Sequence, residues 1–314
     1  MCLIALQRIV TSERRSSMKT NKGRLMLYLI LSFGLTWLWF LLMLPKGETW
    51  DEMPANMQSF VALGMLFPFI AHVLTRWLTK EGFAMTGEGS MLLGISFRDK
   101  KWIYFLVAML LPWFYTELGN VFTLLLNPEC FDPKYYLSLD LDKRLLPLLP
   151  ANAIITGTIV SFAAFGEEAG WRGYMMPKLL SLMPRWAALL VGGVIWGLWH
   201  APLTCIGHNF GTEYPGYPWL GILLMCFICI LLGVILTWIT EMSGSVWPAA
   251  IIHGVNNAGA SILGGYLNPE KERMIWGVSC GWLGMLIGQA IVVFVVIFIW
   301  RKRKSELQIK TQPF

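Results

Sequence analysis

The sequence predicts an all-α protein: a polytopic bundle of about eight transmembrane helices with both termini in the cytoplasm. Of its 314 residues, 56% are hydrophobic and only 14% are charged, whereas a soluble domain is about 45–50% apolar and about 25% charged. The apolar residues form long continuous runs, which favour membrane helices over the alternating strands of a membrane β-barrel. This composition excludes an ordinary soluble enzyme, a disordered protein and a disulfide-stapled secreted module.

Eight apolar runs follow one another along the chain, each close to the roughly 20 residues that a helix needs to cross a bilayer. They lie near residues 25–44, 60–78, 102–126, 146–165, 186–205, 219–239, 246–264 and 276–300. The run at 246–264 is the most polar, because it contains a histidine and two asparagines. Several runs also carry glycines four residues apart, which allow helix backbones to approach closely in lipid. These pairs are Gly166/Gly170, Gly193/Gly197, Gly277/Gly281 and Gly284/Gly288.

The basic residues flank the apolar runs and indicate their orientation. With the N-terminus inside, most of the 25 Lys and Arg residues fall in the inner segments, as the positive-inside rule requires for cytoplasmic termini. A nucleic-acid-binding protein would instead gather its basic residues on one face or arm. The net charge of +6 is therefore a feature of membrane topology, and we expect no nucleic-acid partner.

Ionisable side chains inside membrane spans cost about 2.5–3.5 kcal/mol each on insertion and are functional candidates by default. The fourth run ends in such a group. Glu168 and Arg172 are four residues apart, so on a helix they share a face and can form an ion pair. Glu167 points about 100° away and has no charged partner in its own helix, which suits it to accept and donate protons. A solvated helix end at the membrane interface is the alternative interpretation of this segment.

Two further runs carry a histidine one helical turn from another polar or aromatic residue. Trp196 and His200 share a face in the fifth run, and His253 and Asn257 share a face in the seventh. An imidazole and a carboxamide can provide two hydrogen-bond donors pointing the same way, as an oxyanion requires. Helix packing alone could also account for either pair. The combination favours function, because one carboxylate and two imidazoles on three different helices can converge inside a bundle.

Three other ionisable residues are not assigned to this candidate site of one carboxylate and two imidazoles. His72, in the second run, is interpreted as structural, and His208 as a solvated residue of an outer loop. Glu117 lies in the third run near Asn120; packing and support of the site both remain open for it.

The segments around Glu167, His200 and His253 resemble the CPBP family (CAAX protease and bacteriocin-processing, also called Abi) of intramembrane endopeptidases. The family pattern is EExxxR, then FxxxH, then HxxxN or HxxxD, on successive core helices. The first motif is matched by Glu167, Glu168 and Arg172, including the common Trp-Arg-Gly ending. The resemblance implies a supporting role for the Glu168–Arg172 pair, which would fix the helix end.

The second motif departs from the family, because Trp196 stands where the family usually has Phe, with His200 in register. The third motif is matched by His253 and Asn257. The resemblance implies that Glu167 and His200 activate a water molecule that attacks a peptide carbonyl. It further implies that His253 and Asn257 stabilise the resulting oxyanion. The departure at Trp196 concerns the packing around His200 more than the chemistry.

The family is also described as metalloproteases, and the residues leave a metal-assisted reaction open. Glu167, His200 and His253 would make a His₂Glu set with an open fourth position, the pattern of catalytic zinc sites. No HExxH motif is present, so each ligand would come from a separate helix. Hydrolysis driven by the glutamate without metal, and hydrolysis assisted by one divalent metal such as zinc, are therefore both retained as hypotheses.

We expect a basic N-terminal segment (1–24, with 1–17 preceding an alternative start at Met18), a single transmembrane domain (25–300) whose catalytic core spans about 146–264, and a basic cytoplasmic tail (301–314). The expected substrate is a peptide or protein, and a membrane-anchored or lipidated protein is one form of this hypothesis. The expected location is the bacterial plasma membrane. Two alternatives remain: a proton-coupled transporter, and a non-catalytic immunity or scaffold protein with the same fold. The sequence gives no oligomeric state.

Overall fold

The structure is a computed structural model that describes residues 2–44, 47–259 and 261–310, and the side chains of residues 20–302 within these ranges. Its helices are α1 (Cys2–Met43), α2 (Ala55–Ala62), α3 (Phe67–Thr79), α4 (Trp102–Leu126), α5 (Leu149–Gly170), α6 (Met176–Leu182), α7 (Arg185–Trp199), α8 (Ala201–Thr204), α9 (Trp219–Ser243), α10 (Trp247–Ala258) and α11 (Cys280–Lys310). A π-helical segment, η7 (Trp171–Met175), joins α5 to α6, and 3₁₀ turns include η2 (Leu63–Leu66) and η8 (Leu263–Tyr266). The described strands, β1 (Met274–Ile275) and β2 (Val278–Ser279), form one short antiparallel hairpin.

The predicted all-α membrane bundle is confirmed. Within the described residues, 6 helical stretches are long and apolar enough to cross a membrane: Thr20–Met43, Ala55–Thr79, Arg98–Leu126, Lys143–Leu182, Trp219–Ser243 and Cys280–Lys302. The fifth and seventh predicted runs form shorter helices, α7 with 15 residues and α10 with 12. Both fall short of the roughly 20 residues of a full crossing, so eight crossings remain a prediction.

The shorter helices end where backbone chemistry requires it. Helix α7 stops at Trp199, and Pro202 explains the break, because a proline inside a helix lacks the N–H donor and clashes with the preceding turn. His200 is thereby placed at the C-terminal cap of α7. Helix α10 ends at Ala258, and the next residue, Gly259, takes the left-handed conformation (φ +58°) that commonly terminates helices.

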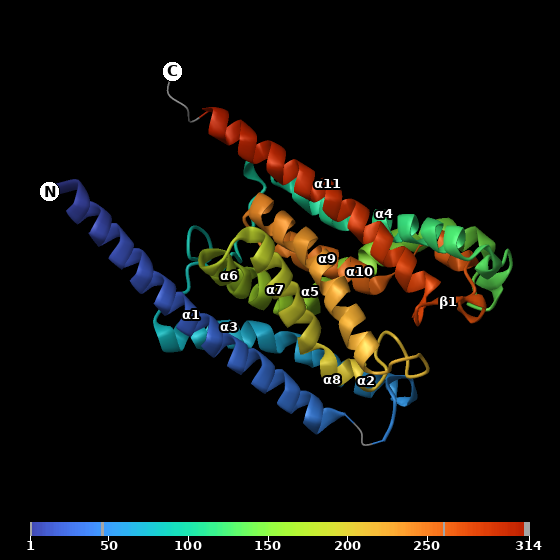
Figure 1. The fold of residues 1–314 in the computed structure, drawn as a ribbon. Helices are drawn as coiled ribbons and strands as arrows, with labels where there is room; N and C mark the ends of the chain where they lie inside the picture. The colour runs from blue at the N-terminus through green and yellow to red at the C-terminus, as the bar shows by residue number, and fades with distance from the viewer. Residues whose placement is uncertain (1, 45–46, 260, 311–314) are drawn as a thin grey trace.

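The helices form two outer pairs around a central group (Figure 1). Helices α1 and α3 pack together on one side, and α4 and α11 pack together on the other. Helices α5, α7, α9 and α10 lie between them, with α5 packed against α10 and α7 packed against α9. Every residue that the sequence motifs singled out lies in the central group or directly after one of its helices, Arg172 in η7 and His200 after α7.

Glycines allow the central helices to approach backbone to backbone. A Cβ atom at Gly197 of α7 would lie 2.5 Å from the Cα of Cys226 on α9, and one at Gly193 would lie 2.5 Å from the Cα of Ile230. Two of the other predicted glycine pairs also lie at helix contacts, Gly166/Gly170 against η2 and α3 and Gly284/Gly288 against α4. The pair Gly277/Gly281 is an exception, because Gly277 lies in the turn between β1 and β2.

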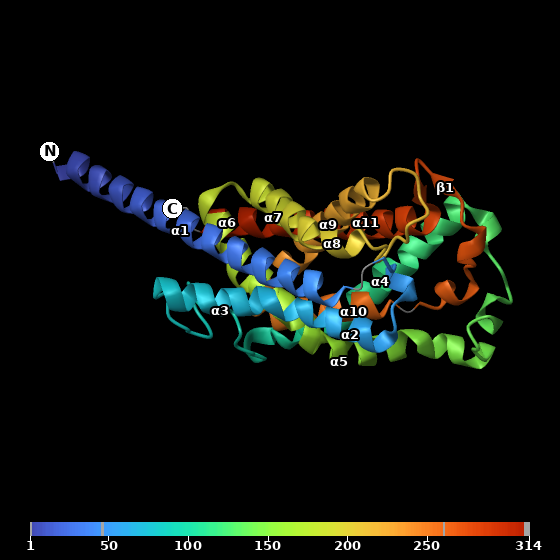
Figure 2. The same cartoon turned by 90° about the horizontal axis from the view of Figure 1, so that it is seen from below.

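Both ends of the bundle carry exposed tryptophans, as expected at membrane–water interfaces. We call the end where α1 begins and α11 ends the terminal end, and the opposite end, with β1 and β2, the hairpin end (Figures 1 and 2). Exposed tryptophans lie at the terminal end of α3, α4 and α7 and at the hairpin end near α9 and β1: Trp77, Trp102, Trp186, Trp219 and Trp276. The cytoplasmic location of the terminal end stays a prediction from the basic residues.

Candidate active site

Glu167 lies near the C-terminal end of α5 and is buried, with 2% of its surface exposed. Its Oε2 accepts a hydrogen bond from Trp196 Nε1 at 2.7 Å and a second from Trp171 Nε1 at 3.3 Å. Trp171, one turn further along the chain, thus provides a donor that helical charge pairing does not predict. A buried carboxylate needs such donors, and two indoles hold this one.

Glu168 and Arg172 form the ion pair that their spacing predicts. Arg172 NH1 lies 3.1 Å from Glu168 Oε1, and both side chains are buried. The same Oε1 atom accepts a hydrogen bond from His253 Nδ1 at 2.9 Å. This contact joins α5 to α10 across 85 residues of sequence, so helical spacing could not reveal it.

The backbone changes its winding immediately after the two glutamates. Residues Trp171–Met175 form a π-helical segment, and the N–H of Met176 donates to the carbonyl of Trp171, five residues back. Such segments are rare and occur frequently at functional sites. Here it carries Arg172 and Trp171, the two residues that contact the glutamates from within the same chain segment.

His200 is buried at the end of α7, and its Nδ1 lies 2.9 Å from the carbonyl oxygen of Trp196. A carbonyl accepts only, so Nδ1 carries the proton and Nε2 of the neutral ring keeps a lone pair. The edge of the ring also packs against Trp199, with centroids 4.8 Å apart. His200 therefore presents a hydrogen-bond acceptor, as a general base requires.

Trp196 is the residue around which the candidate site is organised. Besides its bond to Glu167, its ring lies 4.1 Å from the Arg172 guanidinium carbon and 5.4 Å from the His253 ring in an edge-on contact. Its carbonyl accepts from His200. The acid and both imidazoles, from three helices, thus contact one side chain or its backbone. The sequence indicated an aromatic residue here, but the indole N–H and its acceptor become visible only in three dimensions.

Asn257 differs from the other motif residues in its exposure. It is exposed, on the last turn of α10, and its Oδ1 accepts from Asn256 Nδ2 at 3.4 Å. The neighbouring Asn256 is anchored in turn, because Tyr115 OH donates to its Oδ1 at 2.7 Å. The two members of the expected pair thus share a helix face but have different partners: His253 bonds to Glu168 and Asn257 bonds to Asn256.

The proposed metal ligands do not form a metal-binding group. Among the described residues, no three His, Cys, Asp or Glu side chains come together in a group that could hold one metal ion. His253 Nδ1 bonds to Glu168 and His200 Nδ1 bonds to a backbone carbonyl, so only the Nε2 atoms of the two rings could reach a metal. The set Glu167, His200 and His253 is not gathered around one point in this geometry, and the metal-assisted reaction stays a hypothesis.

Glu117, whose role the sequence left open, anchors the loop that follows α10. Its Oε1 accepts from the backbone N–H of Ile262 at 2.6 Å, and its Oε2 accepts from that of Leu263 at 3.3 Å. Trp113 Nε1 donates to the same carboxylate at 3.0 Å. Nearby, Asn120 donates to Ser261 Oγ at 2.6 Å. Helix α4 thus fixes the chain just beyond the third motif.

The interpretation of His208 as solvated holds only in part, because the residue is half-buried. Its ring packs edge-on against Trp50, with centroids 4.4 Å apart. Burial lowers the pKa of His208 to about 4, although the nearby Asp51 carboxylate opposes that shift. Glycines on either side of His208 suggested an open loop. Instead, the backbone N–H of Trp50 donates to the Ile206 carbonyl at 2.7 Å, and this bond joins the segment after α1 to the segment after α8.

Comparison with known proteins supports the family resemblance. Residues 149–259 match the family model described as "Type II CAAX prenyl endopeptidase Rce1-like". These residues form a CPBP-family domain. The CPBP domain runs from α5 to the end of α10 and contains every motif residue described above, whereas α1–α4 and α11 lie outside the match.

A curated relative extends the similarity. The chain is 33% identical over 139 residues to "CAAX prenyl protease 2" of Methanococcus maripaludis, which is 43% of this chain and 48% of the relative. The chain thus matches about half the length of that protein. The CPBP domain lies in an integral membrane protein, as its apolar helices indicate.

Proposed function

We propose that this protein is an intramembrane endopeptidase of the CAAX-protease type, which hydrolyses a peptide bond at the membrane. The observation that carries the proposal is the gathering of buried Glu167 and two buried imidazoles, from three helices, around Trp196. Membrane insertion disfavours such groups, so a protein that only needed a stable bundle would gain little from collecting them. The CPBP family match supports the same conclusion.

In the proposed reaction, the Glu167 carboxylate and the Nε2 lone pair of His200 hold a water molecule by hydrogen bonds, and Glu167 accepts the proton that the water loses. The water oxygen forms a bond to the peptide carbonyl carbon, and the carbonyl oxygen becomes an oxyanion. The tetrahedral intermediate then collapses, the C–N bond breaks, and the proton held by Glu167 passes to the leaving amine. This is general acid–base catalysis by a single carboxyl group.

The proposed oxyanion donors are His253 Nε2 and the Asn257 amide. Glu168 is an acceptor at His253 Nδ1, so His253 can donate from Nε2 only as an imidazolium, with a proton on both nitrogens. The carboxylate of Glu168 balances that positive charge. Glu168 and Arg172 then act through His253 and the helix end rather than on the substrate.

The proposed substrate is a peptide or protein that reaches the bilayer, and a prenylated protein is the specific candidate. The relative from Methanococcus maripaludis is named as a prenyl protease, and a lipid anchor would bring the scissile bond to a membrane-embedded site. The bacterial plasma membrane remains our proposal for the location of this protein.

Replacement of Glu167 by Gln tests the proposal. Gln retains the size of the side chain and cannot accept the proton, so we expect kcat to fall by about 10²-fold or more. Cleavage of a fluorescent prenylated peptide by detergent-purified protein is the measurement. Glu213→Gln, at an exposed loop position, is the matched control. Cleavage by a folded Glu167→Gln protein at the wild-type rate would rule out this mechanism.

Metal removal tests the retained alternative. The donor geometry leads us to expect that stringent chelation of the purified protein leaves the rate of peptide cleavage unchanged. A loss of activity that returns on addition of zinc would favour the metal-assisted reaction instead and would require the three side chains to rearrange.

A further inference from the structure

His72 of α3 lies outside the proposed reaction but is bound to the backbone of the first motif. The side chain is fully buried, and its Nδ1 lies 2.7 Å from the carbonyl oxygen of Ala169, the residue that follows Glu168. On the other side of the ring, Arg76 Nε donates to His72 Nε2 at 2.7 Å. Because Nε2 accepts, the ring is neutral with its proton on Nδ1, and both of its nitrogens are used.

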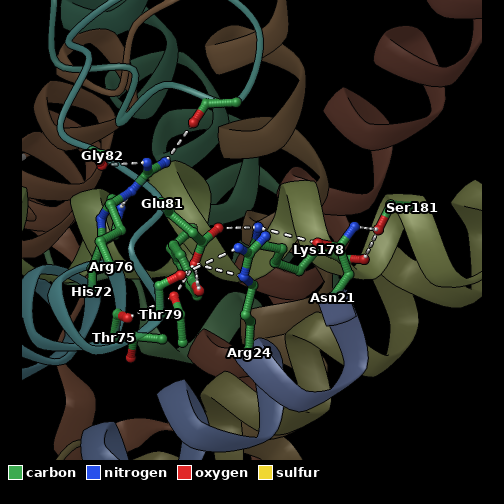
Figure 3. A network of polar contacts seen from close by, with 12 residues as sticks. Asn21, Arg24, His72, Thr75, Arg76, Thr79, Glu81, Gly82, Lys178 and Ser181 are labelled. Carbon is green, nitrogen blue, oxygen red and sulfur yellow. Dashed lines mark hydrogen bonds and ion pairs between the residues drawn. The ribbon is translucent and has the colours of Figure 1, made fainter. Parts of the chain in front are cut away.

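Arg76 fixes His72 and connects it to the loop between α3 and α4 (Figure 3). Its NH1 donates to the carbonyl of Gly82 at 2.9 Å, and its NH2 donates to the carbonyls of Gly89 and Ser90, each at 2.8 Å. Four of the five N–H donors of the Arg76 guanidinium are therefore bound to backbone acceptors and to His72. The side chain is also buried, which favours a positioning role over the binding of an external anion.

The same loop reaches the helix that carries His253. The backbone N–H of Val246 donates to the carbonyl of Leu92 at 2.9 Å, just before α10. Trp247 Nε1 donates to the carbonyl of Leu93 at 3.1 Å. Hydrogen bonds through His72 and Arg76, together with the backbone of the loop, thus connect the chain beside Glu168 to the N-terminal end of α10.

The π-helical segment is held at a second point, by Glu81, which lies just after α3. Tyr174 of η7 donates to Glu81 Oε1 at 2.5 Å. Lys178 binds the other carboxylate oxygen of Glu81 (Figure 3). Burial raises the pKa of Glu81, but hydrogen bonds from Lys178, Tyr174 and Thr79 outweigh that effect and lower it. Glu81 therefore stays ionised at neutral pH and keeps Tyr174 in place while His72 holds Ala169.

We propose that His72 is a positioning residue for the hydrolysis, which holds the Ala169 carbonyl and thereby the turn that presents Glu167 and Glu168. The inference rests on the proposed function. Its physical basis is that a displacement of reacting groups by about 1 Å can reduce the rate about 10²-fold. Loss of the Nδ1–H donor leaves the Ala169 carbonyl without this hydrogen bond, just before η7, where the helix departs from regular α-helical winding.

Two substitutions separate positioning from simple packing. His72→Phe keeps a planar ring but removes both hydrogen bonds, and we expect kcat to fall about 10- to 100-fold with KM nearly unchanged. His72→Gln provides one N–H donor and one acceptor oxygen and should recover a large part of kcat. Thr75→Val, one turn along α3, removes a buried hydroxyl that bonds only to the Ala71 carbonyl of its own helix and serves as the matched control, with wild-type kcat expected.

The protonation of the ring provides a readout that does not depend on activity. Nitrogen NMR of protein labelled with ¹⁵N-histidine, with the His72 signals assigned by their absence in His72→Phe or His72→Gln, should show a protonated Nδ1 and an unprotonated Nε2. An Nε2–H tautomer or an imidazolium at neutral pH would overturn the inference.

The outcomes distinguish this inference from the proposed function. If Glu167→Gln remains active, the proposed mechanism fails, whereas the NMR result still reports on the His72 contacts. If Glu167→Gln is inactive and a folded His72→Phe cleaves with wild-type kcat, the positioning role of His72 is wrong and the proposed function stands. If His72→Phe does not fold, His72→Gln decides: recovery of fold without recovery of kcat would indicate packing alone and overturn the inference.

Discussion

At the scale of single residues, the shortest hydrogen bond to Glu167 comes from the indole of Trp196, at 2.7 Å. Phenylalanine at this position would keep an aromatic ring beside Arg172 and His253 but would lose the donor. A hydrogen bond to a charged group contributes about 1.5–3 kcal/mol, and 1.4 kcal/mol corresponds to about a tenfold change in rate. The residue that departs from the family pattern is therefore the one that orients the proposed base.

We predict that Trp196→Phe lowers kcat about tenfold while the protein remains folded and KM changes little. Steady-state cleavage of a prenylated peptide provides the measurement. Trp113→Phe is the matched control, because Trp113 also donates an indole N–H to a carboxylate, that of Glu117, at 3.0 Å but outside the site. Equal kcat in Trp196→Phe and wild type would mean that Trp171 alone orients Glu167.

Sequence reasoning succeeded at this scale where contacts follow helical periodicity. The i,i+4 rule predicted the Glu168–Arg172 pair, which the structure contains. The same rule could not predict the bond from His253 to Glu168, because the hydrogen-bond partner of a buried residue depends on which helices pack together. The same limit hid the loop contacts of Glu117 and the partial burial of His208.

At the scale of elements, close packing of α5 against α10 brings Glu168 within reach of His253. A Cβ atom at Gly254 of α10 would lie 2.2 Å from the carbonyl oxygen of Gly157 and 2.9 Å from the backbone nitrogen of Ser161. Backbone atoms cannot rotate away, so a larger residue would push the two helices apart. Even one methyl group in such a contact typically costs about 1–3 kcal/mol.

We predict that Gly254→Ala lowers the thermal unfolding midpoint in detergent and also reduces peptide cleavage, because it separates α5 from α10. Gly34→Ala is the control, since a Cβ atom at Gly34 of α1 meets nothing within 4 Å and should leave both quantities near wild type. A Gly254→Ala protein with unchanged stability would show that the α5–α10 contact yields easily.

The hydropathy of the sequence located the helices better than it located their ends. The run at 102–126 coincides with α4, whereas the run at 146–165 continues past its expected end through η7 into α6. Apolar composition carries no information about a change from α-helical to π-helical winding. Pro202, which breaks the helix after α7, and Gly259, which directly follows α10, are both visible in the sequence. A hydropathy average over 19 residues does not detect such single-residue signals.

At the scale of the whole molecule, the chain runs back and forth between the terminal end and the hairpin end, and the basic residues predict which end faces the cytoplasm. Glu88, in the loop between α3 and α4, and Asp140, in the loop between α4 and α5, are both exposed and lie on opposite sides of the bilayer in this topology. They provide a direct test of orientation.

We predict that a membrane-impermeant maleimide labels Asp140→Cys in intact cells and labels Glu88→Cys only after permeabilisation. The background should lack the exposed Cys205 and Cys2, whose side chain lies outside the described residues. Labelling of intact cells by mass shift on a gel is the measurement. The reverse pattern would place the terminal end outside, and labelling of both positions in intact cells would contradict an odd number of crossings between them.

The shared oxygen of Glu168 couples Arg172 and His253, two residues that are far apart in the sequence. Because Arg172 and His253 both bind Oε1, loss of either one leaves the carboxylate with the other, whereas loss of both strands a negative charge in an apolar interior. A change at one position is thus tolerated only while the other is retained, and the two residues should not be lost together while Glu168 remains.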